Sequence, residues 1–597
     1  MPNLQLGKGT HNQGVLADAA ALAGLPGFAG ALIPLRQVHE LYERVRRSPE
    51  GFVLEGLLAE MDVELEIPAA DLERIPKKGP VVVVSNHPYG MLDGAALATL
   101  LTRVRPDVKV LTNFLLGGVP ELERHCIFVD PMQTQHSQAR NRRGLRQALA
   151  WLAGGGMLAI FPAGEVSHWQ MAQAEVTDPR WSDVAARLVD KTGAAALPVY
   201  FCGGNSLAFQ VVGLIHPRLR TLLLLEEFLR QAGKKVAVRV GKAIPADAVA
   251  SLRSEREAIE YLRWRTYLLG QRGRQQLRLP DAVRSLWRRQ RPAPIAPALP
   301  KELLASDAGA LPAERCLAGN GEFAVFAAQA AEIPHLMEEI GRLREVTFRQ
   351  AGEGSGRCSD LDRFDRYYWH IFLWNRAQEE LVGAYRGANT AEVLSQEGLK
   401  GLYTSTLFRY DERFFATIGP ALELGRSFVR PEYQRQYAPL LLLWKGIGRF
   451  IISHAKTPVL FGAVSISNTY NRVSRELIYS FFESRRQGDA LAELVEPRRP
   501  FRPRRQRRPT VTRALRDLEE LSEPISDVEI DGKGLPILLK QYAKIGGRLL
   551  GFNLDRKFSH ALDGLVMVDL RQTEASVLEK YMGREGLAAF RRHHGLG

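Results

Sequence analysis

Cysteine is scarce in this chain of 597 residues. The four cysteines, at positions 126, 202, 316 and 358, are scattered, and no two have the paired spacing of a zinc site or a disulfide framework. We therefore expect no metal centre and no disulfide bonds. A low thiol count of this kind fits a reducing compartment.

The sequence also lacks a long uninterrupted apolar run. Residues 15–35 come nearest, but Asp18, Pro26 and Pro34 interrupt them. A helix lying on a bilayer surface or packed on a domain is therefore favoured over a membrane span. The first residues show no basic head followed by an apolar stretch, so no secretory signal is expected. With the amphipathic, basic pattern of 35–60, residues 1–60 are interpreted as a helical membrane-associating region.

The charge is not balanced. The net charge is +14, and most of the excess is arginine. Such a chain favours anionic partners. No recognisable nucleic-acid-binding motif is present, so we expect an anionic membrane surface or an acidic carrier protein and no nucleic acid.

The most informative stretch is VVVVSNHPYGMLDG at 81–94. Four valines predict a buried strand, Pro88 and Gly90 a turn, and the residues from Gly94 a helix. His87 and Asp93 lie in the turn, where an imidazole oriented by a carboxylate can act as a general base. The alternative is that His87 only caps the turn and Asp93 only caps the helix.

Further strands alternate with helical segments through the first half of the chain. This order predicts an α/β sheet with parallel members and a site at the strand ends. The expected strands are 108–113, 126–130, about 157–161, 194–201 and 234–245, with a helix at 140–152.

These blocks resemble the glycerolphosphate (lysophospholipid) acyltransferase superfamily, although five residues separate His87 from Asp93 where that family has four. FPAGEVS at 161–167 stands where the family has its acceptor-binding block, with Ala163 and Val166 replacing a glutamate and an arginine. The missing arginine argues against a phosphate-bearing acceptor. The resemblance implies an O-acyltransferase domain at 61–270 with His87 and Asp93 catalytic. It also implies substrate-binding roles for Asn86, Arg142, Pro162, Gly164 and Glu165.

Residues 271–312 are basic and then rich in proline and alanine, so they are interpreted as a linker. A second domain is expected over 313–597. Its expected strands are 321–329, 380–386, 401–406, 421–429 and 458–467, the last of which closes the sheet, and its helices are 333–349 and 438–452.

This second order resembles the GNAT acyltransferase fold, and within it the autoinducer synthases and ornithine N-acyltransferases. The matching residues are Asp360 and Asp365, the run 383–386, and Glu423 with Arg426. The resemblance implies that Glu345, Asp360, Asp365 and Glu423 hold or deprotonate an amine, with Glu423 catalytic, and that Arg426 steadies a thioester. The alternatives are a solvated loop for the two aspartates and a cross-strand ion pair for Glu423 and Arg426.

The usual glycine-rich pyrophosphate loop of that class is missing, because VRPEYQRQYAP at 429–439 contains no glycine. We therefore expect an acyl carrier protein as donor, with acyl-coenzyme A as the alternative, and no other cofactor. The arginine-rich segment 496–509 is either a solvated linker or a patch for anionic lipid heads, and the second is favoured. Residues 534–570 resemble the end of the same hemolysin-like family and are assigned to the second domain's sheet.

The two domains together resemble the bifunctional ornithine lipid synthases, over residues 80–585. The fold expected is α/β with two acyltransferase domains. The resemblance implies N-acylation of ornithine with a 3-hydroxyacyl group, then O-acylation of the lyso-lipid hydroxyl, at the cytoplasmic face of the inner membrane as a peripheral protein. Two alternatives remain: the same chemistry on glycine or another amino acid, and a catalytically silent lipid-binding, hemolysin-like protein.

Overall fold

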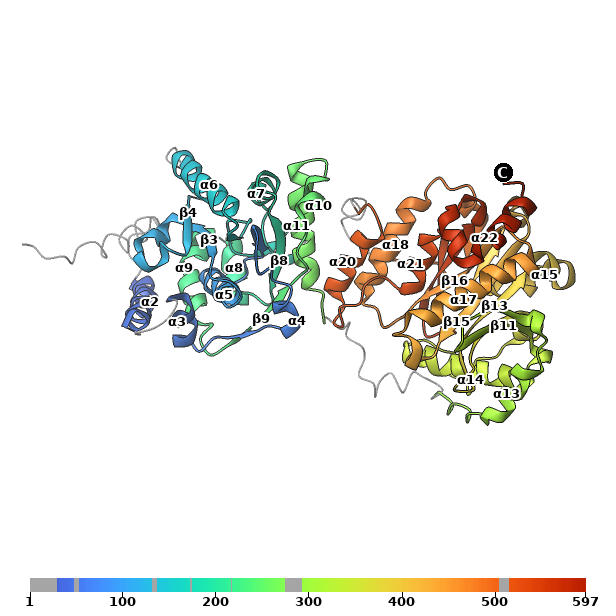
Figure 1. The fold of residues 1–597 in the computed structure, drawn as a ribbon. Helices are drawn as coiled ribbons and strands as arrows, with labels where there is room; N and C mark the ends of the chain where they lie inside the picture. Colours follow the sequence, from blue (N-terminus) through green and yellow to red (C-terminus); the bar gives the residue numbers. More distant parts are fainter. Residues whose placement is uncertain are drawn as a thin grey trace, which may run out of the picture. The chain divides into compact units, whose positions relative to one another are not determined.

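The structure, a computed structural model, describes residues 29–47, 53–130, 137–171, 174–215, 217–273, 292–503 and 515–596. The chain divides into two compact units, Met1–Arg274 and Gln275–Gly597, which Figure 1 colours from blue to green and from green to red. Each unit has its own central sheet. The chain is thus an α/β protein with two central sheets, as the sequence predicts.

The first unit is built on a seven-stranded sheet with the order β1-β9-β8-β2-β5-β3-β4. β2 is parallel to β5 and β8, and β3 is parallel to β4 and β5, whereas β9 is antiparallel to β8. The predicted parallel members are confirmed. The strands are β1 (Glu64–Glu66), β2 (Val81–Ser85), β3 (Val108–Asn113), β4 (Cys126–Val129), β5 (Met157–Ile160), β8 (Ala195–Phe201) and β9 (Lys235–Val240), and a separate hairpin joins β6 (His168–Gln170) to β7 (Glu175–Thr177).

Helices pack on this sheet because its central strands are apolar on both faces. Every residue of β2 is buried, and Val83 shares a core with Leu92, Leu97 and Leu101 of helix α5 (Met91–Thr102). The other helices are α2 (Ala29–Arg47), α3 (Val53–Glu60), α4 (Ala69–Leu72), α6 (Ser137–Ala153), α7 (Val184–Thr192), α8 (Leu207–Ile215), α9 (Pro217–Leu229), α10 (Ala246–Ala250) and α11 (Glu255–Leu269).

The amphipathic helix expected within residues 35–60 is present as two helices, α2 and α3. Leu41 and Val45 of α2 are buried in the same core as Leu58 of α3, so α2 packs on the first unit. Residues 15–28 of the expected membrane-associating segment lie outside the described residues. No helix of the described ranges has the length and apolar content needed to cross a membrane.

The second unit is built on an eight-stranded sheet with the order β10-β11-β12-β13-β15-β16-β19-β18. Neighbouring strands are antiparallel except β15 and β16, which are parallel. The strands are β10 (Cys316–Gly319), β11 (Phe323–Gln329), β12 (Trp369–Asn375), β13 (Glu380–Asn389), β15 (Ala421–Val429), β16 (Val459–Ile466), β18 (Arg548–Asp555) and β19 (Ala561–Asp569).

Helices again cover this sheet, and the long ones are labelled in Figure 1. They are α13 (Lys301–Ala310), α14 (Pro334–Gln350), α15 (Thr390–Glu397), α16 (Glu412–Ile418), α17 (Tyr437–Phe450), α18 (Arg472–Arg486), α20 (Leu518–Val528), α21 (Ile537–Lys544) and α22 (Ala575–His593). A short ribbon of β14 (Phe408–Tyr410) and β17 (Val495–Pro497) lies outside the main sheet.

The parallel pair β15–β16 has an irregular continuation that positions Arg426. The two strands are paired only between Ala421–Glu423 of β15 and Val459–Phe461 of β16. Further along β15, its register with β13 shifts between Ala384 and Arg386, and Arg426 has a φ of 49°. A non-glycine residue in this region marks a local bulge that re-aims its side chain.

Several expectations for the second unit are wrong. Residues 401–406 form 3₁₀ turns instead of a strand, and β12 was not expected at all. β16 does not close the sheet, because β19 and β18 extend it; residues 534–570 do belong to the sheet, as expected.

The interpretation of 271–312 as a linker is wrong for its second part. Residues 301–310 form helix α13, whose Leu304 and Ala308 are buried with Leu336 of α14. Ahead of α13, the Ala293 and Ala296 amides donate to the Gly356 and Cys358 carbonyls. Residues 274–291 lie outside the described part of the chain.

Candidate active sites

His87 and Asp93 meet at the carboxyl end of β2. The His87 Nδ1 lies 3.0 Å from Asp93 Oδ2. The His87 side chain is 19% exposed and that of Asp93 is fully buried. The backbone of His87 is fixed on both sides, because its amide donates to Asp178 Oδ1 at 3.2 Å and its carbonyl accepts from the Ser167 amide at 2.8 Å.

The turn holds five residues between His87 and Asp93, one more than in the superfamily that it resembles. The extra residue is accommodated at Gly90, which has a φ of 84° and caps α5. Asp93 is the third residue of α5, and its Oδ2 also accepts from the amides of Tyr89 (2.8 Å) and Gly90 (3.0 Å). A carboxylate at this position also interacts favourably with the helix dipole. Asp93 therefore caps the helix and pairs with His87 at the same time, so the two interpretations of this residue coexist.

This geometry suits proton transfer by His87. Burial raises the pKa of Asp93, and the hydrogen bond and charge of His87 oppose that rise. Because Asp93 Oδ2 is an acceptor for two amides, it accepts the Nδ1 proton of His87 and leaves the Nε2 lone pair available. Nε2 has no hydrogen-bond partner among the described residues, so a substrate hydroxyl can meet it there.

The loop after β5 lies beside His87, as expected from adjacent parallel strands. Val84 of β2 pairs with Ile160 of β5, and the His87 ring stacks on Phe161 at a centroid distance of 4.3 Å. Beyond Phe161, Pro162 is buried, whereas Gly164 and Glu165 are exposed. The structure thus brings the predicted acceptor block to the base.

Two other predicted substrate-binding residues of this unit lie differently. Asn86 is buried, and its amide exchanges two hydrogen bonds with the backbone of Phe201, at 2.8 and 3.0 Å, so it ties β2 to β8. Arg142 is exposed on α6, the helix that follows the outermost strand β4. Their substrate-binding roles stay predictions.

Asp178 is a residue that the sequence did not suggest. It is buried, and its carboxylate accepts from the His87 amide, from the Ser167 hydroxyl and from the Trp181 indole. It therefore joins the His87 turn to the loop after β5. Its distance of 91 residues from His87 and the absence of a motif around it explain why it was missed.

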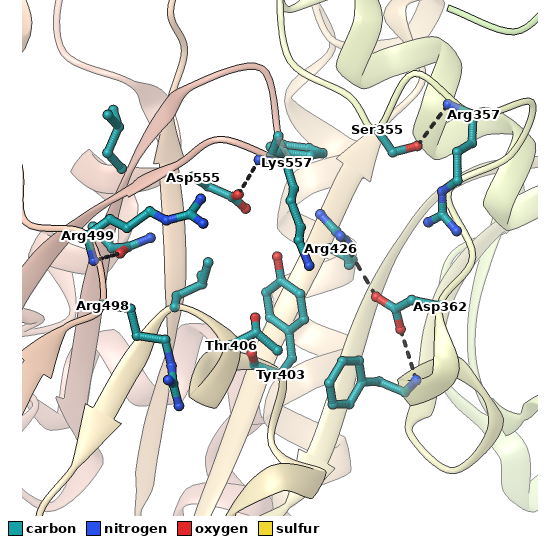
Figure 2. Close-up of a pocket in the computed structure, with 15 residues that line it drawn as sticks. Ser355, Arg357, Asp362, Tyr403, Thr406, Arg426, Arg498, Arg499, Asp555 and Lys557 are labelled. Atoms are coloured by element: carbon teal, nitrogen blue, oxygen red, sulfur yellow. Dashed lines mark hydrogen bonds and ion pairs between the residues drawn. The ribbon is translucent and has the colours of Figure 1, made fainter. Parts of the chain in front are cut away.

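The second unit contains a cavity of about 690 Å³. Figure 2 shows Arg498 and Arg499 on one side, Asp362 and Arg357 on the other, and Tyr403, Arg426 and Lys557 between them. The remaining lining residues are Ser355, Phe364, Thr406, Leu407, Asn553, Leu554, Asp555 and Phe558. Five basic and two acidic side chains line the cavity, so it favours anionic ligand groups.

Of the predicted residues in this unit, Arg426 is the one that lines the cavity. Its Nε lies 3.3 Å from Asp360 Oδ2, and Asp360 is buried behind it. The guanidinium also lies over the Tyr403 ring, 4.9 Å from its centroid. Arg426 is therefore held between a carboxylate and an aromatic face, with its charge at the cavity.

Asp365 and Glu345 are engaged in internal contacts. Asp365 Oδ1 accepts from Arg344 at 2.8 Å and from Arg386 at 3.0 Å. Burial opposes ionisation of Asp365, but these two charges outweigh it and hold its pKa well below the usual range. Glu345 accepts from Arg349 and from the Ser355 and Gly356 amides, so it orders the loop that carries Ser355.

Glu423 is buried and does not line the cavity. Its carboxylate accepts from the Tyr368 hydroxyl and from the amides of Tyr403 (3.2 Å) and Thr404 (2.7 Å). The cross-strand ion pair of Glu423 with Arg426, which was the alternative interpretation, is not formed; Arg426 pairs with Asp360 and Asp362. The geometry makes Glu423 a residue that positions Tyr403, and its catalytic role stays a prediction.

Three buried acids near Arg426 were missed by the sequence analysis: Glu353, Asp555 and Asp563. Burial raises the pKa of Glu353 to about 7, against the lowering effects of the hydrogen bond from Ser465 (2.9 Å) and the charge of Arg426. Burial, then the charges of Asp555 and Glu353, raise the pKa of Asp563 well above its usual range. A carboxylate with a pKa near 7 is suited to accept a proton at neutral pH. They come from three separate segments without a motif.

Two family models match the chain, "Acyltransferase" over residues 55–273 and "Acetyltransferase (GNAT) domain" over 343–445. A glycine N(alpha)-acyltransferase of Bacteroides thetaiotaomicron is 32% identical over 240 residues, which are 38% of this chain and 71% of the relative. A lyso-glycine lipid O-acyltransferase of Phocaeicola vulgatus is 31% identical over 199 residues, 32% of this chain and 68% of the relative. An L-ornithine N(alpha)-acyltransferase of Brucella abortus is 31% identical over 154 residues, 24% of this chain and 50% of the relative.

The matches agree with the two sheets and with the two sites. Relatives named for N-acyl transfer and for O-acyl transfer both match this one chain. The chain therefore belongs to the family of bacterial acyltransferases that these relatives represent, and it is an acyltransferase with an Acyltransferase domain and an Acetyltransferase (GNAT) domain in one polypeptide.

Proposed function

We propose that the protein makes a two-chain amino-acid lipid in two acyl transfers. The second unit joins a 3-hydroxyacyl group to the α-amine of an amino acid, and the first unit then acylates the free 3-hydroxyl. The observation that carries the proposal is the 3.0 Å His87–Asp93 pair, which suits a hydroxyl acceptor, in a chain that also holds a GNAT domain. Relatives named for the two successive steps support this order.

In the O-acyl transfer, His87 Nε2 takes the proton of the lyso-lipid hydroxyl as the oxygen attacks the thioester carbonyl. The new C–O bond forms, the C–S bond breaks, and the thiol leaves with the proton that His87 returns. Asp93 stabilises the imidazolium between these two events. The acceptor carries a carboxylate and no phosphate, which is in keeping with Val166 in place of the superfamily's arginine.

In the N-acyl transfer, the substrate ammonium must lose a proton before its nitrogen can attack the thioester. Glu353 is proposed as the base because it lies two residues before Ser355 of the cavity lining and interacts electrostatically with Arg426 there, and because its pKa of about 7 matches neutral pH. Arg426, at the cavity between Asp360 and Tyr403, holds the substrate carboxylate or the thioester oxygen. The C–N bond forms as the C–S bond breaks, and the leaving sulfur takes the second proton that the nitrogen loses, so the donor departs as a thiol.

The amino acid proposed first is ornithine. Its second ammonium needs a negative partner, and Asp555, whose carboxyl group lines the cavity, can supply it. Glycine is the second candidate. It is favoured by the relative named glycine N(alpha)-acyltransferase, of which the chain covers 71%.

The donor proposed is an acyl carrier protein, with acyl-coenzyme A as the alternative, because residues 429–439 offer no glycine-rich seat for a diphosphate. The protein is proposed to act as a peripheral protein at the cytoplasmic face of the inner membrane. Six exposed large apolar side chains support membrane contact at the first unit, since all of them lie in three segments near the His87 turn: Met91, Trp169, Met171, Val176, Leu207 and Val211.

The test is a reconstitution with purified protein, a 3-hydroxyacyl carrier protein and equal concentrations of ornithine and glycine, analysed by mass spectrometry. The proposal expects the ornithine amide first and the two-chain lipid after a second acyl donor is added. A glycine product in place of the ornithine product would favour the second candidate. Absence of any amide from folded protein would refute the proposed function.

A further inference from the structure

Three cations of the second unit's cavity, two on one side and one near its middle (Figure 2), have almost no counter-charges. Arg499 and the Lys557 ammonium have no hydrogen bond or ion pair through their side chains to any described residue. Arg498 uses only its Nε, which donates to the Ser405 carbonyl at 2.8 Å, so both of its terminal nitrogens remain available. Arg498, Arg499 and Lys557 are called the rim cations below, and all three are exposed.

The backbone that carries the rim arginines is held firmly. The Arg498 amide donates to the Leu407 carbonyl at 2.9 Å, next to the β14–β17 ribbon. The Arg499 amide donates to Asn553 Oδ1 at 2.8 Å, and its carbonyl accepts from the Leu554 amide at 2.8 Å. This segment was expected to be a solvated linker or a lipid patch. Its described part, up to residue 503, is joined to β18 at the cavity and is not a solvated linker, and the lipid patch stays a prediction.

Uncompensated cations on a fixed backbone form a preorganised site for a polyvalent anion, because little ordering is needed when the ligand binds. A single substrate carboxylate does not require the rim cations, since Arg426 already offers a positive charge in the middle of the cavity (Figure 2). The thioester donor must enter the same cavity, and the loop after β15 has no glycine-rich diphosphate seat. The donor's own phosphate therefore matches the rim cations in charge and in place.

We infer that Arg498 and Arg499, assisted by Lys557, bind the phosphate of the donor's phosphopantetheine arm. This inference rests on the proposed function, because it assumes a thioester carried on such an arm. The arm is the same chemical group in acyl carrier protein and in coenzyme A. Arginine suits the role because its planar fork donates two parallel hydrogen bonds to phosphate oxygens.

A binding experiment isolates the phosphate. The full chain and the variant Arg498→Gln/Arg499→Gln are titrated by calorimetry with 4′-phosphopantetheine and with pantetheine, which lacks only the phosphate. The wild type is expected to bind the phosphorylated arm about 10- to 100-fold more tightly, and the variant to lose this preference. Arg502→Gln, an exposed arginine of the same segment outside the cavity lining, is the matched control and should keep it. An unchanged preference in the double variant, with an unchanged melting temperature, would overturn the inference.

Kinetics then separate the two sources of the arm. In N-acylation assays the double variant should raise KM for acyl-carrier protein and for acyl-coenzyme A alike, with KM for the amino acid unchanged. A rise for the carrier protein alone would mean that the arginines contact the protein surface, and a rise for the amino acid alone would mean that they hold its carboxylate. Either result contradicts the inference. The calorimetry needs no turnover. Its result therefore tests phosphate binding even if the proposed acyl transfer proves wrong.

Discussion

The His87 ring and the Asp93 carboxylate lie 3.0 Å apart although five residues separate them in the chain. Gly90 makes this possible, because its φ of 84° turns the chain into α5 and leaves Asp93 in the first helical turn. The same Oδ2 accepts two backbone amides, so the carboxylate is held in place whether or not a substrate is present. The pair is therefore a preformed base with a fixed orientation.

Replacement of Asp93 tests this orientation. Asp93→Asn keeps an oxygen for the two amides but places no charge beside Nδ1, so O-acylation should fall by about 100- to 10,000-fold. Turnover of a supplied lyso-lipid, followed by mass spectrometry, measures the effect. Asp190→Asn, an exposed aspartate of α7, is the control and should leave turnover unchanged. Full activity of a folded Asp93→Asn protein would remove Asp93 from the mechanism.

Glu353 gives the second unit a distinctive pH dependence. Its folded-state pKa of about 7 is above the ordinary value near 4.5, so the folded state binds this proton more tightly. The resulting stability is complete at acid pH and is lost as the pH rises through 7, by at most about 3 kcal/mol. Glu353→Gln should remove this part of the dependence, which melting temperatures between pH 5 and 8 would show. Asp563 adds its own pH dependence to the wild type and to the variant alike, so the difference between their melting temperatures at each pH is the informative quantity. Identical curves of melting temperature against pH for the two proteins would contradict the raised pKa of Glu353.

Asp365 is expected to be important for stability. It lies between the buried guanidinium groups of Arg344 and Arg386, and removing one partner of a buried ionic group leaves the others uncompensated. Asp365→Asn should lower the free energy of unfolding by about 3 to 5 kcal/mol, measured by urea denaturation. The exposed Asp531→Asn, which loses only a surface pair with Lys533, should cost less than about 1 kcal/mol. Equal effects of the two changes would refute the importance of the buried network.

Glu423 is expected to act through Tyr403. Glu423→Gln places an amide N–H₂ where the carboxylate now accepts three hydrogen bonds, so Tyr403 should shift and amide synthesis should fall by about 100-fold. O-acylation of a supplied lyso-lipid by the first unit should be unaffected. The exposed Glu412→Gln of α16 is the control. Unimpaired amide synthesis by the Glu423 variant would show that the position of Tyr403 does not matter.

The sequence allowed the first unit to be predicted well because its signals are local. Four valines, a Pro-Gly turn and a helical pattern are adjacent in the chain, and parallel strands bring their carboxyl ends to one edge. The pairing of His87 with Asp93 was predicted, but the backbone of Gly90 that brings them together across five intervening residues could not be. Asp178 and Asn86 show the same limit, because their partners lie 91 and 115 residues away.

The second unit was harder to predict because its site depends on tertiary contacts. Tyr403 and Thr404 have strand propensity, yet they form a 3₁₀ turn. Their backbone amides donate hydrogen bonds to the Glu423 carboxylate. β12 was missed because it follows directly on an aromatic and acidic loop without a clear alternation. Glu353, Asp555 and Asp563 carry no motif and come together only when β18 and β19 extend the sheet.

The division of labour between the two units is the central claim, and one lipid profile tests it most directly. A host that lacks these lipids is made to express the wild type or His87→Ala, and its lipids are analysed by mass spectrometry. The wild type should give the two-chain lipid, and His87→Ala should give the one-chain amide alone, in increased amount. Normal two-chain lipid from His87→Ala, or loss of both products from protein shown to be folded, would contradict the account.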